Sequence, residues 1–180
     1  MFILILNSSS INSVQNINLN RCENHIGKNF GQKYKVDLIL DDLLEYYFSN
    51  KNVEKEKEWQ CSNCKIKQNI TKKLSLFYLP RLLIIFLNRN SNKGNKIIFP
   101  FENLDIGKYI CDDSPDRYLS KYDLLAVSYF MDNGERKQYE TITKNINGKW
   151  YYSDSHVSID KKKIIDDLTS YIFIYRKKKC

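Results

Sequence analysis

The chain has 180 residues and a net charge of +8, from 29 basic and 21 acidic side chains, and 42% of its residues are hydrophobic. This length predicts one domain with a core of its own. Apart from residues 176–179 the basic side chains are spread along the chain, which indicates a solvated surface rather than a nucleic-acid site. The five cysteines form an odd set with one close pair, which excludes the disulfide framework of a small secreted protein.

Membrane and secretion signals are absent from the sequence. No apolar run approaches the roughly 18 residues that a membrane span requires. Phe2–Leu6 is too short for a signal-peptide core and has no basic residues before it. We therefore expect an intracellular protein, of the cytoplasm or nucleus, with no membrane partner.

The first half of the chain predicts one strand, one long loop and one helix. Phe2–Leu6 has the composition of a short buried strand, so we expect further structure upstream of it. Residues 7–35 are rich in Asn and Ser, which indicates an insertion or loop. Residues 36–48 predict a helix capped by Asp37, since apolar side chains recur on one face at helical spacing. These side chains are Val36, Ile39, Leu40, Leu43, Leu44 and Tyr47.

The second half predicts mainly strands. Residues 72–78 alternate in polarity, and Leu82–Leu87 is a continuous apolar run that suits a central strand. Residues 96–99, 122–129, 138–144 and 150–152 predict further strands, with a hairpin turn at Asn147 and Gly148. Residues 159–168 predict a short helix and 170–175 a last strand, and we expect the basic tail at 177–180 to be frayed.

One cysteine pair has the spacing of a metal site. Cys61 and Cys64 are separated by two residues, which lets both sulfurs point at one tetrahedral Zn²⁺. A structural zinc site needs four ligands, and Cys22 with His25 has suitable spacing to complete a Cys₃His set. The alternative is a remnant half-site, or ordinary thiols in a tight turn, and the sequence leaves both open.

Taken in order, these segments resemble the later part of the ubiquitin-specific protease domain. Residues 36–54 and 59–65 resemble the helix that leads to the second cysteine pair of that family. Residues 71–89 resemble its Lys…Leu-Pro…Leu…Leu-x-Arg signature, and residues 96–100 with 104–105 resemble the Lys-x-x-Phe-Pro and Leu-Asp elements that follow. The most specific matches surround the family's catalytic histidine loop, at residues 122–128, 147–152, 154–157 and 170–175.

The resemblance implies an α+β fold, the mostly antiparallel palm and fingers portion of a papain-like ubiquitin-specific protease domain. Residues 36–75 would form the fingers-like segment with the cysteine pair, and residues 76–176 would form the palm-like sheet. The thumb, which carries the nucleophilic cysteine in this family, is missing. Ubiquitin or a ubiquitinated protein is the implied partner, with Tyr139 and Trp150 as binding residues.

The catalytic residues of the family do not have counterparts here. A thiol protease needs a thiolate, a base and a group that orients the base. The resemblance places the base at Gln138, whose amide cannot take up a proton at neutral pH. The loop with the orienting acid is one residue short, so Ser153 or Asp154 occupies that position, and we expect the nearby His156 to be an ordinary surface histidine. No cysteine lies in a context like that of the family nucleophile.

Three functions are compatible with these observations. The first is a fragment or pseudo-enzyme of this cysteine-type deubiquitinase family, inactive on its own. The second is a non-catalytic module that binds ubiquitin. The third is a zinc ribbon that binds nucleic acid through the positive charge. The third is disfavoured because the basic residues are not interleaved with exposed aromatics.

Overall fold

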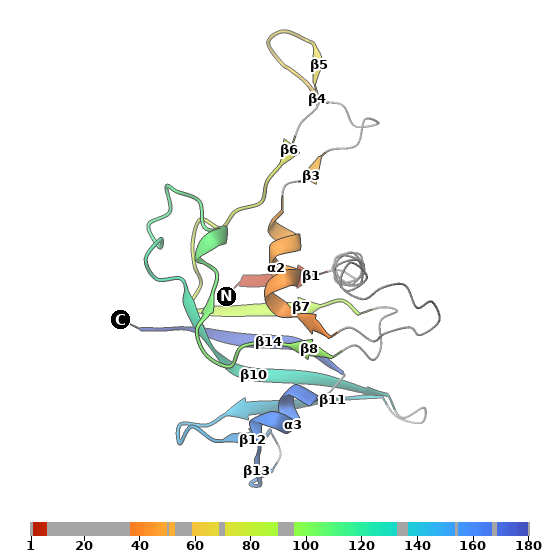
Figure 1. Ribbon diagram of the computed structural model, residues 1–180, viewed down its shortest axis with the longest axis vertical. Coiled ribbons are helices and arrows are strands. Elements are labelled where there is room, and N and C mark those ends of the chain that lie inside the picture. The colour runs from red at the N-terminus through yellow and green to blue at the C-terminus, as the bar shows by residue number, and fades with distance from the viewer. Residues whose placement is uncertain are drawn as a thin grey trace, which may run out of the picture.

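The computed structural model describes residues 2–6, 37–49, 51–52, 59–68, 71–89, 96–132, 137–153, 155–166 and 169–179. In this part of the chain one large sheet has eight strands, in the order β1-β7-β14-β10-β11-β12-β13, with β9 also paired to β10 (Figure 1). Within this sheet β1 and β7 run parallel, and the other neighbouring strands are antiparallel. The mostly antiparallel α+β fold is confirmed. The strands are β1 (Phe2–Leu6), β7 (Leu82–Leu87), β9 (Leu104–Asp105), β10 (Lys121–Asp132), β11 (Lys137–Lys144), β12 (Trp150–Tyr152), β13 (Ser158–Ile159) and β14 (Ser170–Lys177).

The central strands follow the hydrophobic pattern of the sequence. β7 alternates between half-buried and buried side chains, and its buried face consists of Leu83, Ile85 and Leu87. β14 pairs with β7 so that Phe173 and Tyr175, both 0% exposed, lie on the same face. This face is the core side of the sheet, because side chains of directly paired residues point the same way.

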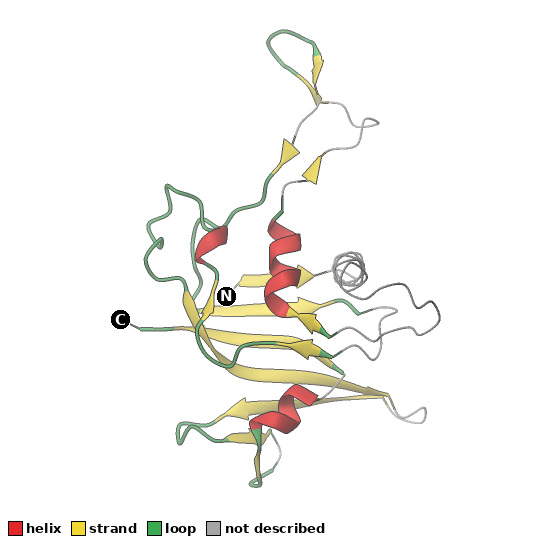
Figure 2. Cartoon of the chain, viewed as in Figure 1, coloured by secondary structure: helices red, strands yellow, loops and turns green. Residues whose placement is uncertain are grey.

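The helix near the start of the described chain is shorter than the sequence predicts. α2 (Leu40–Phe48) buries Leu43 and Leu44, and it packs on β1. It begins four residues after Val36, because β2 (Leu38–Ile39) pairs in parallel with β8 (Ile97–Ile98). Ile39 is therefore the N-cap residue and has no side-chain cap, so the predicted cap at Asp37 is wrong. Figure 2 shows α2 crossing the β1 and β7 end of the sheet.

Two small strand pairs project from the sheet. β3 (Lys51–Asn52) pairs with β6 (Thr71–Lys72), and β4 (Trp59–Gln60) pairs with β5 (Lys67–Gln68). Figure 1 shows them at the far end of the molecule, beyond α2. The strand predicted at residues 72–78 is wrong in extent, since β6 ends at Lys72. Beyond it Leu76 forms only an isolated bridge with Ile110, in the loop after the 3-10 helix η2 (Gly107–Tyr109).

The end of the chain is held more firmly than expected. α3 (Lys161–Asp166) is shorter than the predicted helix, because Ile159 belongs to β13. β14 continues to Lys177, whose Nζ lies 2.8 Å from an Asp116 carboxylate oxygen. Lys178 donates from its Nζ to Asn103 Oδ1 at 2.8 Å. The expectation of a frayed tail is therefore wrong for these two lysines, because each has a side-chain partner.

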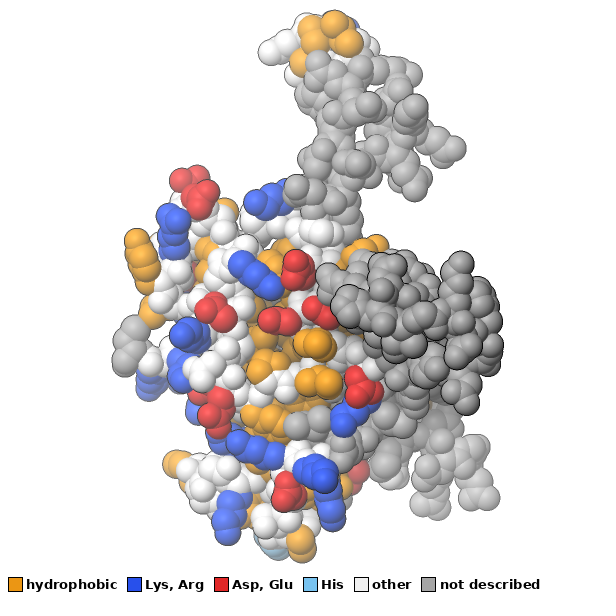
Figure 3. Space-filling model, in the orientation of Figure 1, with side chains coloured by type: hydrophobic (Ala, Val, Ile, Leu, Met, Phe, Trp, Pro, Cys, Tyr) orange, Lys and Arg blue, Asp and Glu red, His pale blue; other side chains and the backbone are white. Residues whose placement is uncertain are grey.

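Hydrophobic side chains gather in the middle of the visible face and charged ones surround them (Figure 3). The core joins α2 to the sheet, and it includes Leu40 and Phe48 on the helix and Phe99 and Phe173 on the sheet side. Phe48 stacks on Tyr109 with ring centroids 4.4 Å apart, which ties the helix to the 3-10 turn. This core fixes β10, β11 and β12, the strands that carry the predicted catalytic positions or lie next to them.

Candidate functional site

Gln138 lies near the start of β11 with its side chain exposed. It pairs with Met131 of β10, one pair away from the end of the ladder at Asp132 and Lys137. Strand alternation places Gln138 on the same face of β11 as Ile142, which is 4% exposed and part of the core. Gln138 is therefore on the core side of the sheet, where the strand extends beyond the packed core. Residues 133–136, between β10 and β11, lie outside the described residues.

Tyr139 points to the opposite face, which we call the outer face, together with Thr141 and Thr143 of β11. Its side chain is 67% exposed. The ring lies 5.2 Å from that of Phe130 and 5.5 Å from that of Tyr171, centroid to centroid. Burial raises the pKa of Tyr171, so this hydroxyl stays protonated at neutral pH. Tyr139 is thus the exposed end of an aromatic group that spans three strands.

Trp150, the other predicted binding residue, is buried, whereas Tyr139 is exposed. Trp150 is 2% exposed, and its ring meets that of Phe101 edge-on at 5.3 Å. It starts β12, where it pairs with Lys144 and Ile159. Trp150 can therefore affect a bound partner only by holding β12 in place.

Ser153, one of the two candidates for the orienting position, is not close to Gln138. Its backbone N–H donates to the Thr141 carbonyl at 2.9 Å, so it lies across from Thr141. That point is three residues, or about 10 Å, along β11 from Gln138. Alternation also puts Ser153 on the outer face and Gln138 on the core side. The structure therefore separates these two side chains, and Asp154 lies outside the described residues.

Cys61 and Cys64 lie at the tip of the β4–β5 hairpin. The turn is closed by the N–H of Lys65, which donates to the Cys61 carbonyl at 2.9 Å, and by the N–H of Cys61, which donates to the Ile66 carbonyl. The backbone N–H of Cys64, followed by that of Asn63, lowers the pKa of the Cys61 thiol by hydrogen bonding. Amide donors that stabilise a thiolate suit a metal ligand.

The described residues supply two of the four ligands that the predicted zinc site would need. No cluster of three or more Cys, His, Asp or Glu is present among them, and the predicted further ligands Cys22 and His25 lie outside them. Cys111, the third described cysteine, lies in the loop after η2, where its N–H donates to the Leu76 carbonyl. None of the three described thiols lies on β11 or β12.

A comparison with known families decides the assignment of the chain. The family model for "Ubiquitin carboxyl-terminal hydrolase" matches residues 6–175. The chain belongs to this family. It is 33% identical to ubiquitin carboxyl-terminal hydrolase 4 of Bos taurus over 156 residues, which is 82% of this chain and 16% of that protein. It is 31% identical to ubiquitin carboxyl-terminal hydrolase 15 of Xenopus tropicalis over 164 residues, which is 86% of this chain and 16% of that protein.

Solved structures show the same fold. A SAGA Ubp8/Sgf11/Sus1/Sgf73 DUB module bound to ubiquitin aldehyde contains a chain that superposes with a TM-score of 0.64 at 20% identity, over 81% of this chain and 35% of that one. A second SAGA DUB module, bound to monoubiquitin, contains a chain that superposes with a TM-score of 0.62 at 21% identity, over 79% and 35%. This hydrolase-family chain thus corresponds to about a third of the chains it matches in solved structures and about a sixth of its curated relatives.

No helix among the described residues is long and apolar enough to cross a membrane.

Proposed function

We propose that this chain is the palm and fingers portion of a ubiquitin-specific protease domain, and that it binds ubiquitin or ubiquitinated proteins without hydrolysing them. Residues 36–75 form the fingers-like segment in this proposal, and residues 76–176 form the palm. The setting is intracellular, in the cytoplasm or nucleus. The observation that carries the proposal is Gln138, a neutral carboxamide exposed on β11 where the family has its catalytic histidine.

The chemistry of Gln138 argues against hydrolysis. An imidazole accepts and returns a proton near neutral pH, and a carboxamide does not. Ser153 lies about 10 Å along the strand from Gln138 and on the other face, so its hydroxyl does not reach the residue that it would have to orient. Cys61 and Cys64 are on the hairpin tip, which Figure 1 shows far from β11. These placements support a chain that lacks a working triad of its own.

Ubiquitin binding is supported by the fold of the chain and by one exposed aromatic side chain. The chain matches chains of SAGA DUB modules that are bound to ubiquitin aldehyde and to monoubiquitin. Tyr139 offers a large, 67% exposed aromatic surface next to Gln138, and such side chains contribute strongly to protein interfaces. These two observations support a ubiquitin-binding role for the chain.

Two measurements test this proposal together. The first is turnover of a ubiquitin C-terminal fluorogenic substrate, with a wild-type relative of the family as positive control. We expect no release of fluorophore by this chain above the rate of buffer alone. The second is a titration of labelled ubiquitin, in which we expect saturable binding. Hydrolysis would overturn the inactive assignment, and a lack of binding at high ubiquitin concentration would overturn the binding role.

A further inference from the structure

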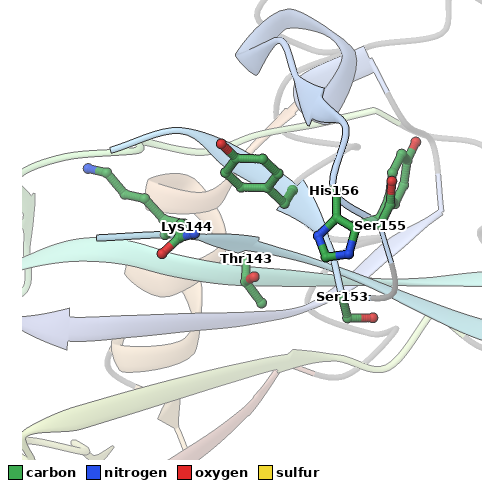
Figure 4. A pocket seen from close by; sticks show the side chains of 8 residues that line it. Thr143, Lys144, Ser153, Ser155 and His156 are labelled. Carbon is green, nitrogen blue, oxygen red and sulfur yellow. The ribbon is translucent and has the colours of Figure 1, made fainter. Parts of the chain in front are cut away.

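An open groove of about 650 Å³ lies on the outer face of β11 and β12, beside the loop that follows β12. Thr143 belongs to β11, Tyr151 pairs with it from β12, and the loop contributes the remaining polar groups. Figure 4 shows Thr143, Ser153 and His156 near one another, while Lys144 extends away from them. The side chains used below are Thr143, Lys144, Tyr151, Ser153, Ser155 and His156.

Most of the hydroxyls in this groove have a proton to donate. Thr143 and Ser153 make no side-chain hydrogen bond to other described residues. Ser155 Oγ accepts from the Val157 N–H at 3.1 Å, which leaves its own O–H available. The Tyr151 hydroxyl accepts from Asn147 Nδ2 at 2.9 Å and likewise keeps its proton to donate. Four O–H donors therefore line one concavity from two strands and a loop.

The described residues that line the groove include basic side chains but no acidic ones. Lys144 and His156 are the basic lining residues, but alternation directs the Lys144 side chain to the core side of β11, as it does Ile142. The acidic group paired with Lys144 is Glu102, whose oxygen lies 3.9 Å from the Lys144 Nζ. His156 makes no hydrogen bond or ion pair to other described residues. A concave surface with several hydroxyl donors, the imidazole of His156 and no described lining carboxylate complements an anion that has several acceptor oxygens.

We propose that this groove binds a tetrahedral oxyanion, a phosphate group, between Thr143, Ser153 and His156. Donors reach the groove from β11, β12 and the loop, so they surround a ligand from several directions. That arrangement suits four tetrahedral oxygens better than the planar pair of a carboxylate. The groove is separate from Gln138, which lies on the other face of β11, and it shares the outer face with Tyr139, four residues along the strand from Thr143.

Titration with inorganic phosphate at constant ionic strength tests the site, with the backbone amide signals of the groove residues followed by NMR. We expect saturable shifts of these signals. His156→Ala and Thr143→Val each remove one donor, and each should weaken binding by about tenfold, as expected for a hydrogen bond to a charged group. The matched control is Lys162→Ala, which removes an exposed positive charge from α3 and should leave the affinity unchanged.

Several outcomes would contradict the proposal. Shifts that grow without saturation would mean general ionic effects on a basic protein. An equal loss of affinity in Lys162→Ala would mean the same. Thr143→Val keeps the shape and strand propensity of the side chain, so circular dichroism of this variant separates lost binding from lost fold.

A second titration identifies the source of the phosphate. A short peptide with one phosphoserine should bind more tightly than inorganic phosphate if the ligand is a modified protein, and equally if it is the free ion. In either case His156→Ala must weaken the binding. Phosphopeptide binding that is unchanged in His156→Ala would overturn the site.

Discussion

The Nζ of Lys177 lies 2.8 Å from Oδ1 of Asp116, and the other carboxylate oxygen of Asp116 accepts the backbone N–H of Leu79 at 2.8 Å. One carboxylate thus joins the end of β14 to the segment before β7 and to the loop after η2. Its side chain is 24% exposed and that of Lys177 15%, so solvent screens the pair only in part. This ion pair explains why the basic tail is ordered at its start.

Asp116→Asn should therefore destabilise the chain by about 1 kcal/mol at neutral pH. The hydrogen bond from Lys177, followed by that from the Leu79 N–H, lowers the pKa of Asp116 below its ordinary value of 3.8. A lowered pKa gives stability that is present above 3.8 and is lost as pH falls through the lower folded value. Urea unfolding at neutral and acid pH should show that the free energy of unfolding falls less on acidification in Asp116→Asn than in the wild type. Asp113→Asn, at an exposed neighbour, should match the wild type throughout.

Two buried tyrosines bind the sheet to two of its proline-containing connections. The Tyr122 hydroxyl donates to the Pro80 carbonyl at 2.7 Å, and the Tyr175 hydroxyl donates to the Pro100 carbonyl at 2.8 Å. Both side chains are 0% exposed. Burial raises the pKa of both phenols well above the ordinary value of 10.0.

Raised phenol pKa values predict a loss of stability in alkali. The contribution of the two hydroxyls to folding stability is complete below pH 10.0. It is lost as the pH rises through their pKa values in the folded protein, because the unfolded chain releases these protons first. Tyr122→Phe and Tyr175→Phe should each lower the free energy of unfolding by about 1 kcal/mol at neutral pH and reduce the alkaline loss. Tyr118→Phe, at a side chain that is 90% exposed, should do neither. Thermal unfolding across this pH range measures all three.

The sequence predicts the central sheet because its strands carry strong patterns. The continuous apolar run of Leu82–Leu87 and the alternation in β10 and β11 are enough to identify core strands. The same pattern does not reveal β2, since Leu38 and Ile39 continue the helical spacing of α2. It also does not reveal the pairs β3–β6 and β4–β5, because two-residue strands are too short to show a period.

The candidate site is less predictable than the sheet. Family motifs locate Gln138 and Ser153, but only the pairing of β11 with β12 shows that these side chains point to opposite faces. The groove at Thr143 and His156 has no linear motif, because it combines a strand and a loop that come together through the hairpin. The Asp116–Lys177 pair joins residues 61 positions apart, a separation at which local sequence carries no signal.

Substitutions at Tyr139 and Trp150 should affect different quantities, ubiquitin affinity for the first and the free energy of unfolding for the second. Tyr139→Ala removes a 67% exposed ring, so it should change the free energy of unfolding by about 0.5 kcal/mol or less and weaken ubiquitin binding. Trp150→Ala empties a core position and should cost about 3–5 kcal/mol of stability. Ile146→Ala, at a fully exposed turn position, is the control for both. Wild-type affinity in a folded Tyr139→Ala variant would remove Tyr139 from the binding surface.

Metal analysis of cysteine variants should reveal how many ligands the hairpin site has. Cys61→Ser and Cys64→Ser should each reduce zinc bound by the purified chain, because two cysteines at this spacing can both point at one ion. If Cys22 and His25 complete the site, Cys22→Ser and His25→Ala will lower the zinc content to the same extent. Zinc that is retained in those two variants would contradict the Cys₃His set. Cys111→Ser, away from the hairpin, serves as the control.

Restoring histidine at position 138 should not restore hydrolysis. Gln138→His supplies an imidazole on the core side of β11, but Ser153 remains about 10 Å along the strand and on the outer face. No described thiol lies on β11 or β12, so these two strands offer the new base no thiol to deprotonate. The exposed position of Gln138 should let the variant fold with unchanged stability, within about 0.5 kcal/mol. Release of fluorophore from a ubiquitin C-terminal substrate by Gln138→His alone would show that a nucleophile reaches this site, and the assignment of an incomplete triad would then fail.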